Sequence, residues 1–449
     1  MTNGNGENMI CVVGLGYVGL TLALTLSECG LEVCGVDVSE KVVDNLEQGQ
    51  SHFYEKGLKE KIASQLGNGF KCSTLISEGQ GCNIFIIAVG TRVGADEKPD
   101  FKELDSSALS IGSVLKKGDL IILRSTVPVG VTRNYVAPLL EKVSGLKVGT
   151  DFLLAFAPER TVEGDALNEL KSLPQVIGGF DKASTDKAVA LFRLFAPNII
   201  VVDSLEEAEL VKMVNNSYRD LVFSFANELA LICDKFNIDT AKMIDAANFG
   251  YSRSNIPKPS PGVGGYCLTK DPYLLYYSAE QAGYAPQLAT VSRKINRAMP
   301  EYIRRMIQEF FTKFQNKKDK PRVTLFGFAF KGNPPTSDTR FSPTLDLADL
   351  LLKQDNIDLY GHDFEVSAET IKGAGVLPEE NIESAFKDKD CAVFMNNHPG
   401  YKDLPITSLL GQARKPILIV DPWKLFDRAV IERLGGVYYG NLGYRNFNV

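Results

Sequence analysis

The chain has 449 residues, a formal net charge of −6 and a sequence pI near 5.4. Apolar residues make up 44% and charged residues 23%, which is typical of a folded globular protein, and the length predicts two or three domains. The acidic balance and the absence of Lys/Arg runs argue against a nucleic-acid partner. The first residues lack the features of a signal peptide, and the longest apolar stretch, residues 221–233, is too short to span a bilayer, so we expect no membrane partner.

The eight cysteines and three histidines are scattered along the chain. No C-x-x-C pair occurs, and the histidines lie far apart. This pattern favours a reducing, cytoplasmic location and predicts no metal site.

The first predicted unit is a dinucleotide-binding motif. A short apolar strand at residues 9–13 runs into GLGYVG at 14–19, followed by a helical pattern at 20–28 and a second strand at 31–36 that ends before Asp37. In such a motif, Gly14, Gly16 and Gly19 make the tight turn, the helix amino terminus holds the pyrophosphate, and the acid bonds the ribose hydroxyls. Asp37 favours NAD over NADP, because a carboxylate there repels a 2′-phosphate.

The same alternation continues to about residue 203. Apolar runs of strand length are separated by helical stretches, and this predicts a parallel sheet with helices on both faces. The runs lie at residues 83–89, 119–125, 152–157, 175–179 and 199–203.

A long helix is predicted next, at about 204–236, and its second half (221–232) is apolar around much of its circumference. Such a helix is buried on several sides, between domains, between subunits or both. Helical pattern resumes at 287–314, and the hydrophilic stretch 315–322 is a predicted linker.

Beyond the linker, alternation restarts and predicts a second α/β domain. Its apolar runs lie at 323–328, 345–352, 357–360, 391–395 and 417–420. The predicted fold is therefore α/β, with two Rossmann-like doubly wound domains joined by a long central helix. We divide the chain into a dinucleotide-binding domain at 1–203, a helical domain at 204–314 and a second α/β domain at 321–449.

The most informative segment is PGVGGYCLTKDP at 261–272. Its glycines permit close approach to a ligand, and the Cys267 thiol is a strong nucleophile whose thiolate Lys270 would favour. The alternative is a buried structural cysteine in a glycine-rich turn.

Other polar residues stand at strand ends or share a helix face. Lys212 and Asn216 are one helical turn apart. STVPVG at 125–130, PERTVEG at 158–164 and GFAFKG at 327–332 each end a predicted strand, where open α/β sheets bind ligands. Taken singly, each also fits an ordinary solvated loop or ion pair.

Together, six motifs resemble the UDP-sugar 6-dehydrogenases, which oxidise a nucleotide-bound hexose to a uronic acid. The motifs are GLGYVG at 14–19, STVPVG at 125–130, PER…EG at 158–164, K…N at 212 and 216, GVGGYC…KD at 262–271, and GFAFK…DTR…SP at 327–343. The resemblance leans toward the arm that oxidises UDP-N-acetylmannosamine and other UDP-N-acetylhexosamines, through APER at 157–160, NSYRD at 216–220, FANEL at 225–229 and DPWK at 421–424. Tyr266 and Lys270 depart from that arm, and Lys270 is more typical of the UDP-glucose arm, which stays the alternative.

This resemblance implies a two-step oxidation by NAD through a thiohemiacetal and a thioester on Cys267. Lys212 and Asn216 are then expected to stabilise oxyanions, Thr126 and Asp271 to hold a water, and Glu159 to assist hydrolysis.

The resemblance also implies two sets of ligand contacts and an oligomer. Arg253 is expected to reach a neighbouring subunit. The apolar circumference of the helix at 221–232 independently predicts at least a homodimer. The NAD contacts besides the three glycines are expected at Tyr17, Val18, Asp37, Thr91, Thr126 and Arg340. The UDP-sugar contacts are expected at Arg160, Thr161, Lys212, Asn216, Arg219, Arg253, Gly264, Phe330, Lys331 and Lys424.

Two other classes share part of this pattern. A hydroxyacid dehydrogenase of the 6-phosphogluconate type needs neither the cysteine nor the second α/β domain. A non-catalytic sugar-nucleotide sensor has no need of a nucleophile.

Overall fold

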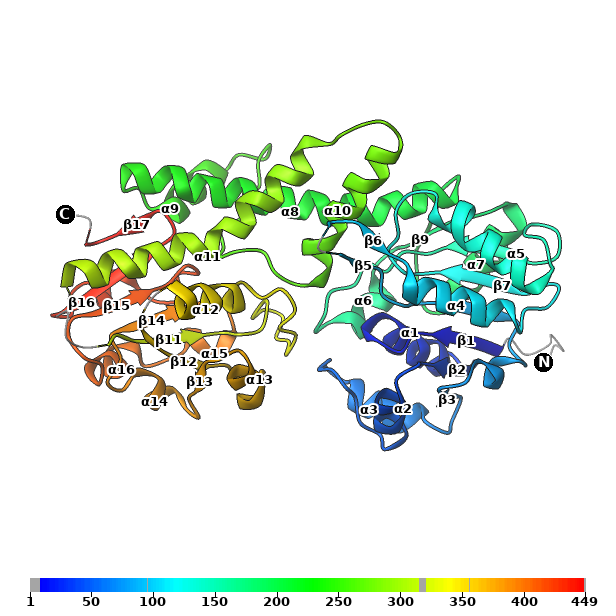
Figure 1. Cartoon of the computed structure of the whole chain (residues 1–449), viewed down its shortest axis with the longest axis horizontal. Coiled ribbons are helices and arrows are strands. Elements are labelled where there is room, and N and C mark those ends of the chain that lie inside the picture. The colour runs from blue at the N-terminus through cyan, green and yellow to red at the C-terminus, as the bar shows by residue number, and fades with distance from the viewer. Residues whose placement is uncertain (1–8, 95, 315–319, 355, 448–449) are drawn as a thin grey trace. The chain divides into compact units, whose positions relative to one another are not determined.

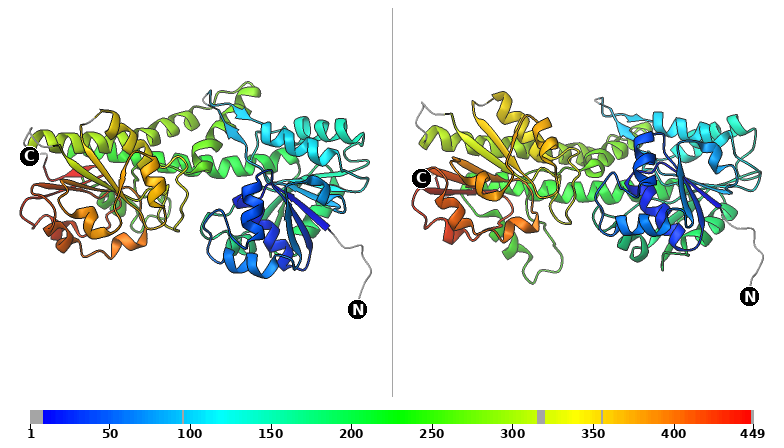
Figure 2. Two further views of the ribbon diagram at one scale, coloured as in Figure 1. Left: turned by 60° about the horizontal axis from the view of Figure 1, so that its bottom comes forward. Right: turned by 90° about the horizontal axis from the view of Figure 1, so that it is seen from below.

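The predicted strands form two separate sheets, each in its own unit of the chain (Figure 1). The computed structural model describes residues 9–94, 96–314, 320–354 and 356–447. The first unit consists of Met1–Asn215 and Tyr273–Ala285, and the second consists of Asn216–Pro272 and Pro286–Val449. Helices cover both faces of each sheet, as Figure 2 shows. The predicted α/β fold class, with two such sheets and a long central helix, is confirmed. The three domain boundaries stay a prediction. The predicted linker also stays a prediction over residues 315–319, which lie outside the described residues.

The sheet of the first unit has the strand order β10-β9-β8-β7-β4-β1-β2-β3. The order reverses between β1 and β4, which is where doubly wound sheets bind ligands. The strands of this sheet are β1 (Met9–Val13), β2 (Glu32–Val36), β3 (Phe70–Ser73), β4 (Ile84–Ile87), β7 (Leu120–Leu123), β8 (Leu153–Phe156), β9 (Gln175–Gly179) and β10 (Ile199–Val201). A separate antiparallel pair is formed by β5 (Arg92–Val93) and β6 (Pro99–Asp100).

Side chains that alternate along the strands fill two cores, one on each face of this sheet. Ile10 and Val12 pack with α1 on one face, whereas Cys11 and Val13 pack with α4 on the other. The helices of this unit are α1 (Tyr17–Glu28), α2 (Glu40–Glu47), α3 (Leu58–Gln65), α4 (Lys102–Gly112), α5 (Ala137–Ser144), α6 (Ala166–Ser172) and α7 (Lys182–Phe192).

The first sheet departs from the predicted all-parallel order at one place. Strand β9 pairs with β8 in the antiparallel sense, with Phe156 opposite Gly178, and β10 runs parallel to β9. A parallel neighbour requires a crossover that returns the chain to the edge where the preceding strand began. Between β8 and β9, the helix α6 has only seven residues, and β9 begins at the edge where β8 ended.

The second sheet has the order β13-β12-β11-β14-β15-β16-β17 and is parallel except for the pair β16 and β17. Its order reverses between β11 and β14, as in the first sheet. The strands are β11 (Arg322–Phe326), β12 (Asp358–His362), β13 (Leu377–Pro378), β14 (Cys391–Phe394), β15 (Ile417–Val420), β16 (Val437–Asn441) and β17 (Tyr444–Arg445).

One face of the second sheet packs against α11 and α12, and the other packs against α14, α16 and α17. The apolar run at 345–352 lies inside α12. The helices of this unit are α9 (Thr240–Asn248), α11 (Gln287–Phe314), α12 (Pro343–Gln354), α13 (Ala368–Gly373), α14 (Ile382–Phe386), α15 (Pro399–Lys402), α16 (Ile406–Gly411) and α17 (Arg428–Ile431).

Two helices contribute residues to both units: α8 (Leu205–Phe236) and α10 (Tyr266–Gln281). In the second unit, α8 buries Ala226, Asn227 and Ala230 but leaves Phe225 and Ile232 half exposed. The predicted burial on several sides is therefore incomplete in a single chain. None of the helices in the described part of the chain has the length and apolar character to span a bilayer.

Candidate active site

A cavity of about 680 Å³ opens at the carboxyl ends of β1, β2 and β4, where the first sheet reverses its strand order. Its lining includes Gly14, Gly16, Asp37 and Gly90. The Asp37 carboxylate accepts hydrogen bonds from the backbone N–H of Leu15 (2.8 Å) and of Ser39 (2.9 Å). These two contacts fix the acid beside the glycine turn, where the sequence predicts it.

The glycines of this turn meet two different needs. A Cβ at Gly19 would lie 1.8 Å from the Gly14 carbonyl oxygen, so only glycine allows α1 to approach the strand. A Cβ at Gly16, in contrast, would meet nothing within 4 Å, because its backbone faces open space at the helix amino terminus. Among the described residues, no side chain caps that end of α1, so its backbone N–H groups are available to an anion. The cavity therefore fits the pyrophosphate and ribose of a dinucleotide.

The remaining predicted cofactor residues lie outside the lining of this cavity. Tyr17 and Val18 are in the first turn of α1, where the Tyr17 hydroxyl contacts Glu55 and accepts a hydrogen bond from the backbone N–H of Gly164 (2.7 Å). Thr91 is buried, and Thr126 is half-buried in the loop after β7. Arg340 belongs to the second unit.

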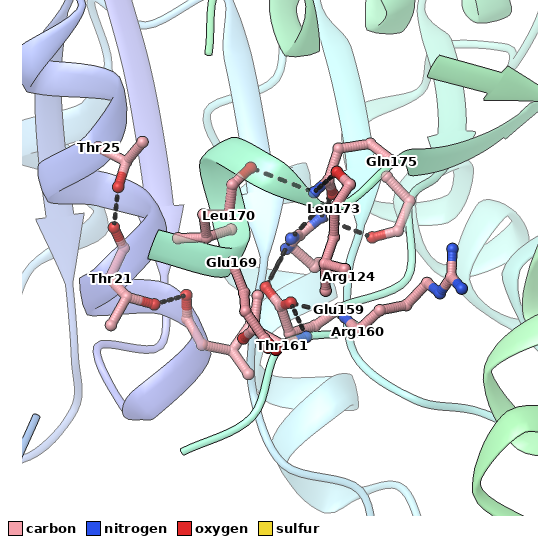
Figure 3. A network of polar contacts seen from close by, with 12 residues as sticks. Thr21, Thr25, Arg124, Glu159, Arg160, Thr161, Glu169, Leu170, Leu173 and Gln175 are labelled. Atoms are coloured by element: carbon pink, nitrogen blue, oxygen red, sulfur yellow. Dashed lines mark hydrogen bonds and ion pairs between the residues drawn. The ribbon is translucent and has the colours of Figure 1, made fainter. Parts of the chain in front are cut away.

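A second polar cluster in the first unit surrounds Glu159, which follows β8 (Figure 3). One carboxylate oxygen of Glu159 accepts from the backbone N–H of Arg160 (2.6 Å) and of Thr161 (2.7 Å), and the other accepts from the Arg124 guanidinium. Burial by itself raises the pKa of the Glu159 carboxyl, but Arg124, the Thr161 N–H and Lys212 outweigh burial and lower it. Glu159 is thus an anion held close to the positive charge of Lys212, which is itself buried.

Sequence reasoning missed Glu209, which fastens α8 to the loop that carries Thr126. The fully buried Glu209 carboxylate accepts from the backbone N–H of Gly130 (2.5 Å) and of Thr132 (2.8 Å). Burial raises the pKa of Glu209 to about 7. Glu209 stands three residues before Lys212, and that spacing on one helix face was the signal that could have found it.

The cysteine segment lies in the second unit, at the start of α10. Cys267 is exposed, which argues against the alternative of a buried structural thiol. Lys270 and Asp271 form a buried ion pair (2.8 Å), and the Asn216 amide donates to the other Asp271 oxygen (2.5 Å). Burial lowers the pKa of Lys270, but Asp271 and Cys267 outweigh it and the pKa rises, so a persistent ammonium lies within electrostatic range of the thiol.

The glycines before the cysteine allow this segment to pack against the loop that follows β11. A Cβ at Gly264 would lie 2.5 Å from the Phe341 carbonyl oxygen, and a Cβ at Gly265 would lie 2.6 Å from the Phe330 ring. The Gly265 N–H donates to the Arg340 carbonyl oxygen (3.2 Å). The structure thus brings together two predicted motifs, through residues that are more than sixty positions apart in the sequence.

The other predicted substrate residues are dispersed. Arg160 and Thr161 are in the first unit, and Lys331 follows Phe330 in the second. Lys424 pairs with Asp239 (2.6 Å). Arg219 and Arg253 are both exposed. Among the described residues, no group of three or more His, Cys, Asp or Glu side chains could hold a metal ion.

Three family models match this chain in order along its length. They describe the NAD binding domain (residues 8–196), the central domain (206–298) and the UDP binding domain (324–428) of the UDP-glucose/GDP-mannose dehydrogenase family. Matches to all three favour the predicted family over the 6-phosphogluconate-type alternative.

Individual relatives are similar over most of their length. A UDP-N-acetyl-D-mannosamine dehydrogenase of Pyrococcus horikoshii is 31% identical over 92% of this chain and 94% of its own. An NDP-N-acetyl-D-galactosaminuronic acid dehydrogenase of Ralstonia solanacearum is 32% identical over 88% of this chain and 92% of its own. A solved structure of a UDP-D-ManNAc dehydrogenase from Pyrococcus horikoshii has a TM-score of 0.87 at 30% identity, covering 97% of this chain and 99% of the other.

Proposed function

The chain belongs to the UDP-glucose/GDP-mannose dehydrogenase family, and on that premise we propose that it oxidises C6 of a UDP-N-acetylhexosamine to a UDP-uronic acid with NAD. UDP-N-acetylmannosamine is the favoured substrate, because relatives that match over nearly the whole chain carry that name. UDP-glucose is the competing substrate, since Lys270 is more typical of that arm.

The observation that carries this proposal is the exposed Cys267 at the start of a helix, within range of the buried Lys270 ammonium. A cation and a helix amino terminus both favour the thiolate, which is the nucleophilic form. A binding protein without turnover has no use for such a thiol.

Conversion of an alcohol to an acid removes four electrons, and NAD, which Gly14, Gly16 and Asp37 would hold, would accept one hydride in each of two oxidations. In the first oxidation the C6 hydroxyl also releases its proton. Between these steps we propose that the Cys267 sulfur bonds to the C6 aldehyde, whose oxygen takes up a proton to give a thiohemiacetal. That adduct retains a C–H bond, so a second hydride can leave while the hydroxyl gives up its proton, and the product is a thioester. Water then adds to the thioester carbonyl, the carbon–sulfur bond breaks, and the thiolate is regenerated.

The polar residues that the resemblance singles out have separate proposed roles. Lys212 and Asn216, both buried, stabilise the alkoxide and tetrahedral oxyanions as fixed donors. Thr126 and Asp271 hold a water that moves protons, and Glu159 assists the hydrolytic step. The predicted NAD and UDP-sugar contacts stay proposals, including those at Arg160, Arg219, Arg253 and Lys331.

A substrate panel tests the reaction and the sugar together. UDP-N-acetylmannosamine, UDP-N-acetylglucosamine and UDP-glucose are each incubated with NAD, and NADH is read by absorbance. The favoured sugar should yield two NADH per molecule consumed, with little free aldehyde. A yield of one NADH per sugar would contradict the proposed two-step oxidation. If UDP-glucose were the only sugar of the panel that supported reduction of NAD, the proposed substrate would be wrong.

Variants of the cysteine test the covalent steps. Cys267→Ala should lose turnover to the uronate, and Cys267→Ser should accumulate a covalent ester, because an oxygen ester hydrolyses far more slowly than a thioester. Intact-mass spectrometry of the Ser variant should show about one added sugar-nucleotide per chain. Cys29→Ser, at another exposed cysteine, is the matched control and should behave as wild type. Full turnover by Cys267→Ala would remove the thiol from the mechanism.

We also propose that the protein is at least a homodimer built around α8 and that it works in the cytoplasm. Tyr218, Phe225, Ile232 and Phe236 recur at intervals of seven or four residues along α8 and are 49–71% exposed in the single chain. Apolar side chains at that spacing form one stripe that a second copy can cover. All eight cysteines are free thiols, which suits a reducing compartment. A fully active monomer in light scattering at micromolar concentration would contradict the dimer.

A further inference from the structure

Arg124, which follows β7 directly, is among the largest fully buried side chains of the described residues, with only 1% of its surface exposed. A buried guanidinium is costly unless its donors are paired. Here Nε (3.1 Å) and Nη2 (2.5 Å) both donate to one oxygen of Glu159. Nη1 donates to the Ala157 carbonyl oxygen (3.1 Å). Gln175, which lies beside Arg124 in Figure 3, accepts from Nη1 and Nη2 (3.4 and 3.3 Å).

These contacts leave the Glu159 carboxylate little freedom to turn. Arg124 donates hydrogen bonds to one oxygen, and the backbone N–H groups of Arg160 and Thr161 donate to the other. We infer that Arg124 is a positioning residue of this site, whose guanidinium orients the Glu159 carboxylate and keeps it anionic, while Gln175 steadies the guanidinium in turn. The inference rests on the proposed function, in which Glu159 assists hydrolysis.

The charges that face Glu159 support this role. Arg124 reaches it from the end of β7 and Lys212 from α8, whereas Gln175, from β9, is neutral. Glu169 of α6 accepts from the backbone N–H of Val162 (2.7 Å) and so holds the same loop. Burial opposes ionisation of Glu159, so the anion depends on the two cations and on the backbone donors.

Loss of the guanidinium should therefore change how activity depends on pH. An opposite charge at this range lowers a carboxyl pKa by about 1–3 units, so its removal should raise it by a similar amount. A protonated Glu159 cannot accept a proton from the attacking water. The activity of an Arg124→Met variant should then fall as the pH drops through the raised pKa of Glu159.

The experiment measures kcat against pH, from about pH 5 to 9, for wild type, Arg124→Met, Glu159→Gln and the double variant. We expect the acid limb of Arg124→Met to lie about 1–3 pH units above that of wild type, and the double variant to lack this displaced limb. Arg124→Lys keeps the positive charge but loses the pair of hydrogen bonds that the guanidinium donates to Glu159. It should keep the acid limb of wild type and lose kcat by about 100-fold, with KM little changed.

Lys389→Met is the matched control, because it removes the buried cation of another ion pair, Lys389 with the half-buried Glu379 (2.7 Å), in the second unit. It should lower thermal stability and leave the acid limb in place. If Arg124→Met does not fold, Arg124→Lys decides the question. A wild-type acid limb in Arg124→Met, or a wild-type kcat in Arg124→Lys, would overturn the inference. A wild type that reduces no NAD with any UDP-sugar would instead refute the proposed function.

Discussion

Replacement of Asp271 by Asn should destabilise the second unit strongly, because it breaks a buried ion pair from one side. Lys270 and Asp271 have side chains that are 6% and 0% exposed, with their charged atoms 2.8 Å apart. The variant keeps an oxygen that can accept from Asn216 but leaves the Lys270 ammonium buried without its counter-charge. Loss of one partner of such a pair costs about 3–5 kcal/mol in the free energy of unfolding.

Each kcal/mol is worth roughly 2–4 °C in Tm for a unit of about 200 residues, so Asp271→Asn should melt roughly 6–20 °C below wild type. Its kcat should also fall by about 10²–10⁴-fold if Asp271 holds the proton-moving water. Scanning calorimetry and NADH absorbance measure the two effects separately. The stability deficit should shrink at higher pH, because burial without Asp271 favours the neutral form of Lys270.

A double variant, Lys270→Met with Asp271→Asn, separates the stability effect from the catalytic one. It removes both charges, so it should recover much of the lost stability while turnover stays low. An Asp271→Asn protein that melts within about 2 °C of wild type would refute the reasoning, since it would show that the pair contributes less than about 1 kcal/mol. A double variant no more stable than Asp271→Asn would do the same.

Three further predictions concern other residues. Asp37→Ala should reduce the preference of kcat/KM for NAD over NADP by about 10-fold or more, because about 1.4 kcal/mol of repulsion is enough for that factor; a wild type that uses both cofactors equally would contradict it. Arg253→Ala should raise KM for the UDP-sugar roughly 10–100-fold with little change in kcat, as expected for loss of a charged contact to the nucleotide, and an unchanged KM would exclude that contact. Because the pKa of Glu209 is raised from 4.5 to about 7, wild type should lose about 3 kcal/mol of stability as the pH rises from about 4.5 to 7. Glu209→Gln should abolish that loss in urea unfolding, and parallel pH dependences for the two proteins would argue against it.

Local patterns were enough to predict the dinucleotide motif. The turn at 14–19, the helix after it and Asp37 lie within about thirty residues, and their hydrogen bonds and apolar periods involve near neighbours. The helix begins at Tyr17, three residues before the predicted start, since Val18 and Gly19 belong to its first turn. The strands of both sheets could be predicted for the same reason, because buried parallel strands are short apolar runs.

The sequence by itself therefore determined the α/β class, the glycine turn with Asp37, and the position of Cys267 between a run of glycines and Lys270. Only the tertiary structure decided that β9 runs antiparallel, that Arg124 meets Glu159, and that the Gly264 segment packs on the loop after β11. These contacts join residues that are tens of positions apart. Local hydrogen bonding and the spacing of apolar residues therefore could not predict them. They depend on strand order and on which loops share a sheet edge, and those are settled only when the whole core packs.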